Sequence, residues 1–114
     1  MKKITLATIK SIKRNGGATI NKYGDRVTMK SGYQVSKRDL HIIPVDELDK
    51  LIIKEAMKLL QNRSEYLGVW IDNGNAYIDI SIRIATKRDA IARGRELNQL
   101  SVLRWNDCEC LAVE

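Results

Sequence analysis

Apolar and polar residues alternate on both sides of Asn73-Gly74, and this pattern predicts a β-hairpin from Tyr66 to Ala85. An Asn-Gly pair favours a type I′ turn because both of its central residues need positive φ angles. Counting outward from the turn sets the register of the hairpin and places Trp70 opposite Tyr77.

The two faces of this hairpin differ in composition, because side chains alternate between the faces of a sheet. One face is aliphatic and is expected to be core: Leu67, Val69, Ile71, Ala76, Ile78, Ile80, Ile82 and Ile84. The other face mixes aromatic, acidic and basic groups: Tyr66, Trp70, Asp72, Tyr77, Asp79, Ser81 and Arg83. A simple solvated surface has no need of that mixture, so we expect a second subunit, a ligand or another protein to cover it. Asp72 and Asp79 are expected to pair with Arg83 or solvent and not to hold a metal.

Helical spacing of apolar residues predicts a helix over 47–61, with Asp46 as its N-cap, packed on the aliphatic face. Thr5 is expected to cap a short helix that stops at 15–17, for which a strand is the alternative. Thr86 is expected to cap a further helix with a narrow face of small residues, ending at Asn98.

Short alternating segments at 18–22, 26–30 and 33–37 predict a small meander, and 41–45 is either its last strand or an extended approach to the helix. Residues 100–105 and 108–113 predict a closing hairpin. The expected fold is α+β, a mainly antiparallel sheet with two to three helices packed on one face. One domain over 1–114 is expected, divided into a basic N-terminal helix and meander (1–45), the helix (47–61) and a hairpin-helix-hairpin unit (66–113).

The length of 114 residues suits a single domain with a large surface for its volume, which favours oligomers. No segment has the length and hydropathy of a membrane span, so a cytoplasmic protein is expected. Cys108 and Cys110 are too few for a zinc site and fit a reducing compartment.

The net charge of +6 is unevenly distributed along the chain. Residues 1–45 hold ten basic and two acidic residues, and the remainder holds ten basic and twelve acidic ones. The N-terminal pole is mostly lysine, which suits diffuse attraction to anions. Arginine dominates after Lys58 and suits planar contacts with phosphate or carboxylate.

Catalysis has little support in the sequence. The single histidine, His41, lies in the apolar stretch His-Ile-Ile-Pro and is expected to be structural. No phosphate-cradling glycine motif is present. We therefore expect a protein that is not an enzyme and that needs no metal or cofactor.

Binding is the better supported class, because a nucleotide site needs cations for phosphate, flat rings for stacking and amides for base edges. The candidate ligand-binding residues are Tyr66, Trp70, Tyr77, Arg83, Arg88, Arg93, Arg95, Asn98, Gln99, Arg104 and Trp105. Trp70 and Tyr77 have three alternative roles: a cross-strand pair at a homo-oligomer interface, a ligand platform, or ordinary surface.

Three segments carry a resemblance to small proteins of phages and prophages of Gram-positive bacteria: Gly32-Tyr33-Gln34-Val35-Ser36, Gly68 to Gly74 with its return strand Tyr77 to Ser81, and Asn98 to Val102 followed by Trp105. Among these, the chain most resembles the Thoeris anti-defence family, which sequesters cyclic ADP-ribose isomers. The resemblance implies a homo-oligomeric sponge that binds a nucleotide immune signal, cyclic ADP-ribose-like or a cyclic oligonucleotide, without cleaving it. It implies that arginines and aromatics hold the pyrophosphate and adenine at an inter-subunit pocket.

Two rival functions remain. One is an anti-CRISPR-type inhibitor that binds a host defence protein or an RNA-guided effector. The other is a small nucleic-acid-binding protein that uses the lysine-rich residues 1–45 and whose affinity falls steeply with salt.

Overall fold

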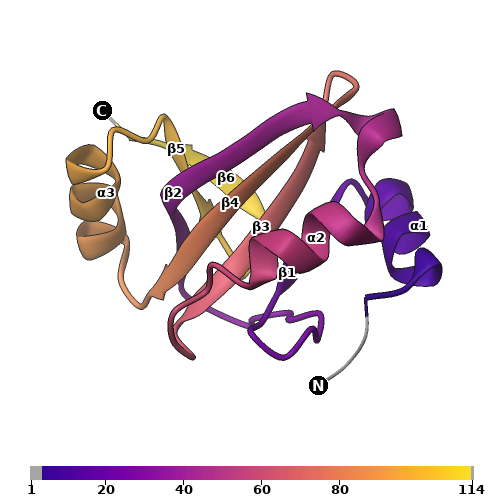
Figure 1. The fold of residues 1–114 in the computed structure, drawn as a ribbon. Coiled ribbons are helices and arrows are strands. Elements are labelled where there is room, and N and C mark those ends of the chain that lie inside the picture. The colour runs from indigo at the N-terminus through magenta and orange to yellow at the C-terminus, as the bar shows by residue number, and fades with distance from the viewer. Residues whose placement is uncertain (1–3, 114) are drawn as a thin grey trace.

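A computed structural model describes residues 4–113 and arranges six strands in one antiparallel sheet with three α-helices (Figure 1). The elements are α1 (Leu6–Asn15), β1 (Gly17–Ile20), β2 (Tyr33–Pro44), the 3-10 turn η1 (Val45–Glu47), α2 (Lys50–Met57), β3 (Glu65–Asp72), β4 (Asn75–Ile84), α3 (Lys87–Glu96), β5 (Ser101–Arg104) and β6 (Glu109–Ala112). The strand order is β1-β3-β4-β2-β5-β6. The expected α+β fold is confirmed.

The central hairpin forms with the predicted register. Asn73 and Gly74 have φ angles of 48° and 78°, and β3 pairs with β4 from Asp72 opposite Asn75 to Tyr66 opposite Ser81. The turn is also tied to the start of η1, since Val45 N donates to Gly74 O. Local turn chemistry therefore fixes which side chains share each face of these two strands.

All three helices pack on the aliphatic face of the sheet. Helices α1 and α2 cover the apolar residues of β1, β3 and the first part of β4, with Ile12, Ile53 and Leu67 fully buried. Helix α3 covers the other end, where Ala90 packs with Val35 and Val102. In Figure 1, α2 lies across the sheet near α1, and α3 lies at the opposite end beside β2 and β5. The predicted packing of the second helix on the hairpin is confirmed.

The polar face of the sheet is concave. Strands β1 and β2 are separated by β3 and β4, which would hold them about 14 Å apart in a flat sheet. Nevertheless Thr19 Oγ1 donates to Gln34 Oε1 at 3.0 Å, so side chains of these two strands meet across the interior. The sheet curls around its polar face, and the closing β5–β6 hairpin supplies part of the cover that was expected for the mixed face of the hairpin.

Helix ends follow the predicted caps in two cases. Thr5 accepts from Thr8 N at the start of α1, and Thr86 accepts from Asp89 N at the start of α3. The strand alternative for the first segment is therefore wrong. Asn98 ends α3 with a φ of 56°, as expected.

Two predictions about elements are wrong. No meander forms, because β1 pairs with β3, residues 26–30 contribute only an isolated bridge at Arg26, and the third segment continues to Pro44 as one long strand beside β4. Long-range pairing overrode the local turn signals. The helix predicted over 47–61 is shorter, with a 3-10 turn before it and Asp49, not Asp46, accepting from Ile52 N as its cap. Within residues 4–113 no helix is long and apolar enough to cross a membrane.

An ion pair between the exposed Lys37 and the buried Glu65 joins β2 to the start of β3. Glu65 is 3% exposed and accepts from Lys37 Nζ at 2.6 Å and from Gln61 N at 2.6 Å. Lys37 reaches it from a β-bulge between Ser36 and Arg38. The hydrogen bond from Lys37, followed by that from Gln61 N, holds the pKa of Glu65 below its usual value.

We expect Glu65→Gln to lower the free energy of unfolding by about 1–3 kcal/mol at pH 7, because it removes a charged acceptor from two donors. A lowered pKa stabilises the native state above the pKa of the unfolded chain, and this contribution is lost as pH falls through the folded pKa. The difference between variant and parent should therefore shrink on acidification in denaturant titrations. Glu55→Gln is the control, because its pair with Lys58 is exposed and exposed pairs contribute little. Equal effects of the two substitutions would contradict a stabilising role for the ion pair of Glu65 with Lys37.

Candidate functional site

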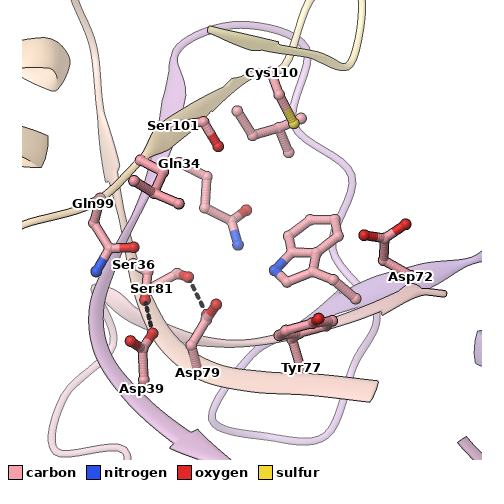
Figure 2. A pocket seen from close by; sticks show the side chains of 13 residues that line it. Gln34, Ser36, Asp39, Asp72, Tyr77, Asp79, Ser81, Gln99, Ser101 and Cys110 are labelled. Carbon is pink, nitrogen blue, oxygen red and sulfur yellow. Dashed lines mark hydrogen bonds between the residues drawn. The ribbon is translucent and has the colours of Figure 1, made fainter. Parts of the chain in front are cut away.

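The concave face holds a cavity of about 450 Å³, within the range of small-molecule sites. Its lining comes from β2, β3, β4 and the closing hairpin with the turn before it: Gln34, Ser36, Asp39, Trp70, Asp72, Tyr77, Asp79, Ser81, Gln99, Leu100, Ser101, Leu103 and Cys110. Figure 2 shows the labelled side chains gathered around this space. The segments Gly32–Ser36, Gly68–Ser81 and Asn98–Val102 are far apart in the sequence, and each contributes to the lining.

Asp79 is the buried carboxylate of the cavity, with 8% of its surface exposed. Its Oδ1 accepts from Ser81 Oγ at 2.6 Å, and the donor side chains of Trp70 and Ser36 also act to lower its pKa. Burial, the largest effect, together with the charge of Asp39 raises the pKa of Asp79 to about 6, against the opposing hydrogen bonds. The expectation that Asp79 pairs with Arg83 or solvent is wrong, because Arg83 turns away to Ser31.

Gln34 supplies an unused hydrogen-bond donor. Its side chain is 4% exposed, and its Oε1 accepts from Thr19 while its buried Nε2 has no hydrogen-bond partner among the described residues. In the structure Thr19 Oγ1 donates to Gln34 Oε1, and Nε2 lies on the side of the cavity. Buried amide donors are almost always paired in proteins. An unpaired amide that faces a hollow is therefore a group that a polar atom of a ligand or a water molecule can pair with.

Trp70 and Tyr77 face each other across the hairpin and both line the cavity half-exposed. Gly68 makes room between the Trp70 indole and the Asp79 carboxylate. A Cβ atom at residue 68 would lie 2.5 Å from Asp79 Oδ1 and 2.9 Å from Trp70 Nε1. Only glycine at this position therefore allows the indole and the carboxylate to approach each other.

Two grooves adjoin the cavity and share lining residues with it. On the Tyr77 side a groove is lined by His41, Ile42, Asn98 and Leu100 as well as by cavity residues. On the Trp70 side another groove, which shares Trp70, Leu103 and Cys110 with the cavity, contains Arg26 and Trp105. These adjoining hollows, called the trough below, have carboxylates at the centre and Arg26 in the groove beside Trp70. His41, which was expected to be structural and not catalytic, is exposed in this trough.

The structure brings together only part of the predicted ligand-binding set. Trp70, Tyr77 and Gln99 line the cavity, and Asn98 and Trp105 line the flanking grooves. The remaining predicted residues line neither the cavity nor the two grooves: Tyr66, Arg83, Arg88, Arg93, Arg95 and Arg104.

The arginines lie elsewhere for identifiable reasons. Arg88, Arg93 and Arg95 belong to α3, which packs on the opposite face of the sheet through Ala90 and Ile91. Arg93 pairs with Glu96 on the same helix. Arg104 donates two hydrogen bonds to the carboxylate of Asp107 across the β5–β6 turn.

Several residues of the cavity were missed by sequence reasoning, chiefly Gln34, Ser36, Asp39 and Ser101. The polar residues that flank Val35 in β2 carried a signal, because alternation places Gln34 and Ser36 on one face. This alternation could not place the two residues in the cavity, since nothing local indicates that β2 pairs with β4. Cys108 and Cys110 are free thiols, and within residues 4–113 no group of three or more potential ligands could hold a metal ion.

Comparison of the chain with protein-family models, with curated proteins and with solved structures finds no match in any of the three. The fold and the site define an α+β protein whose trough has carboxylates at its centre. This trough is the feature from which a function can be inferred.

Proposed function

We propose that this protein binds a nucleotide in the trough without converting it, and that it acts as an anti-defence protein by sequestering a nucleotide immune signal. The signal is of the cyclic ADP-ribose or cyclic oligonucleotide class. Sequestration and the anti-defence role rest on the resemblance to Thoeris anti-defence proteins. The chemistry of the cavity supports the choice of ligand.

The observation that carries the proposal is the unpaired amide of Gln34, buried beside two aromatic rings and a carboxylate in one cavity. A nucleobase is flat and bears donors and acceptors on its edge. It can therefore stack on an aromatic ring while pairing with an amide and a carboxylate. The three segments that carry the resemblance converge on this cavity, which further supports the proposal.

The test is to expose purified protein to extract from defence-active cells, repurify it, denature it and identify released small molecules by mass spectrometry. We expect an intact nucleotide. Trp70→Ala should retain at least about tenfold less nucleotide, because stacking on an aromatic side chain contributes about 1–3 kcal/mol per base. Its native mass should match that of the parent protein.

Tyr23→Ala is the matched control, because Tyr23 is an exposed aromatic in the 21–25 turn outside the trough. Release of no nucleotide after exposure to extracts of several defence types would contradict the proposal. Recovery of one stoichiometric host protein instead would favour the inhibitor hypothesis. A fall in native mass on Trp70→Ala, with retention of the nucleotide unchanged, would assign Trp70 to an oligomer interface and count against its role in the site.

A further inference from the structure

The trough presents different chemistry at its centre and at its Trp70 end. At the centre, Gln34 Nε2 is an unpaired donor, and the Asp79 carboxylate has acceptor capacity beyond the donors Ser81, Trp70 and Ser36. Figure 2 shows the labelled Gln34 and Asp79 side chains pointing into the cavity. At the Trp70 end, Arg26 is exposed and its Nη1 donates to Ser11 Oγ, which leaves most of its five N–H donors available.

We infer that a bound nucleotide lies in one direction along the trough, with the edge of its base on Gln34 and Asp79 and its phosphate at Arg26. This inference rests on the proposed nucleotide-binding function and names which part of the ligand each end of the trough holds. Trp70, Leu103 and Cys110 line both the cavity and the Arg26 groove, so the two hollows border each other at these residues.

The charges in the trough set this direction. Asp39, Asp72 and Asp79 all line the central cavity, where no lysine or arginine is among the lining residues. A phosphate placed there would face carboxylates and leave its oxygens without charged donors. At the Arg26 groove the lining holds no carboxylate.

The pairing needs of Gln34 and Asp79 exclude two other occupants of the centre. An ammonium or guanidinium group offers donors only, so it satisfies Asp79 but leaves Gln34 Nε2 unpaired. An anion offers acceptors only and is repelled by Asp79. The edge of a nucleobase offers a donor and an acceptor together, and it can therefore pair with both side chains.

The test measures the affinity of the full chain by calorimetry for AMP, GMP, CMP, UMP and the base-free ribose 5-phosphate, and then for the nucleoside of the tightest nucleotide. We expect that nucleotide to bind more tightly than ribose 5-phosphate by at least about tenfold, since the base pairs buried polar groups that ribose 5-phosphate leaves unpaired. Arg26→Ala should weaken the nucleotide about tenfold and leave the nucleoside unchanged. Arg38→Ala, at an exposed arginine outside the trough, should change neither.

Gln34→Met should weaken the binding of the nucleotide and of its nucleoside by the same factor, about tenfold. Gln61→Met, at an exposed glutamine outside the trough, should weaken the binding of neither. The comparison with ribose 5-phosphate uses the parent protein, so the inference stays testable if Gln34→Met does not fold. Ribose 5-phosphate that binds as tightly as the nucleotide, or Arg26→Ala that weakens nucleoside and nucleotide equally, would overturn the inference and leave nucleotide binding intact. Failure of AMP, GMP, CMP and UMP alike to bind would also overturn the inference, whereas the proposed function is overturned by the release of no nucleotide after exposure to the extracts.

Discussion

Asp79→Asn is expected to raise the free energy of unfolding at neutral pH by up to about 3 kcal/mol while it weakens nucleotide binding. Burial raises the pKa of Asp79 from 3.8 to about 6, and each tenfold change in proton affinity corresponds to about 1.4 kcal/mol. Asparagine removes the buried charge, and its Oδ1 can still accept from Ser81. Its amide, however, presents donors to a ligand where the carboxylate presented acceptors.

The effect of this substitution on stability has a defined pH dependence. A carboxyl whose folded pKa is raised takes up its proton in the native state first, so the native state loses stability as pH rises from about 4 to about 6. Parent and Asp79→Asn should therefore have similar unfolding free energies below pH 4, within about 0.5 kcal/mol, and differ most above pH 6. Denaturant titrations across this interval measure the difference.

Asp72→Asn is the control for this experiment, because Asp72 lies on the same face of the hairpin but is exposed. It should change stability by less than about 0.5 kcal/mol. If Asp79→Asn destabilised the protein at pH 7, the hydrogen bonds of the carboxylate would outweigh the penalty of burying it, and a raised pKa for Asp79 would be wrong.

Ile78→Ala is expected to lower the free energy of unfolding by about 2–5 kcal/mol, the range for truncating a fully buried aliphatic side chain. Ile78 is 1% exposed and packs in the cluster that α1 and α2 cover. Ile42→Ala is the matched control, because Ile42 in the neighbouring β2 is 65% exposed and should cost less than about 0.5 kcal/mol. Thermal and denaturant unfolding of both variants measures the contrast, and a similar loss at Ile42 would show that this surface is covered in solution.

The parts of the fold that sequence could predict are those determined by nearby residues. The Asn73-Gly74 turn sets the register of β3 and β4, and that register alone places Trp70, Tyr77 and Asp79 on one face. The caps at Thr5 and Thr86 likewise follow from side chains within one helical turn. These predictions hold because local geometry leaves few alternatives.

The parts that could not be predicted depend on pairing between distant strands. Gln34 joins the site only because β2 pairs with β4 and the sheet curls, and neither leaves a mark within a short window of sequence. The arginines of α3 were assigned to the ligand because their number suggested a function. The small residues that face the sheet do indicate which side of α3 is buried, but not which side of the sheet that helix covers.

The position of the helices has a consequence for how such a protein changes over time. Because α1, α2 and α3 all anchor the outer wall of the curled sheet, both apolar clusters lie outside its hollow interior. Substitutions there can exchange one small molecule for another while the scaffold stays intact. Under the proposed function, a host that altered its signalling compound would be answered by a few replacements in the hollow, with no need for a new architecture.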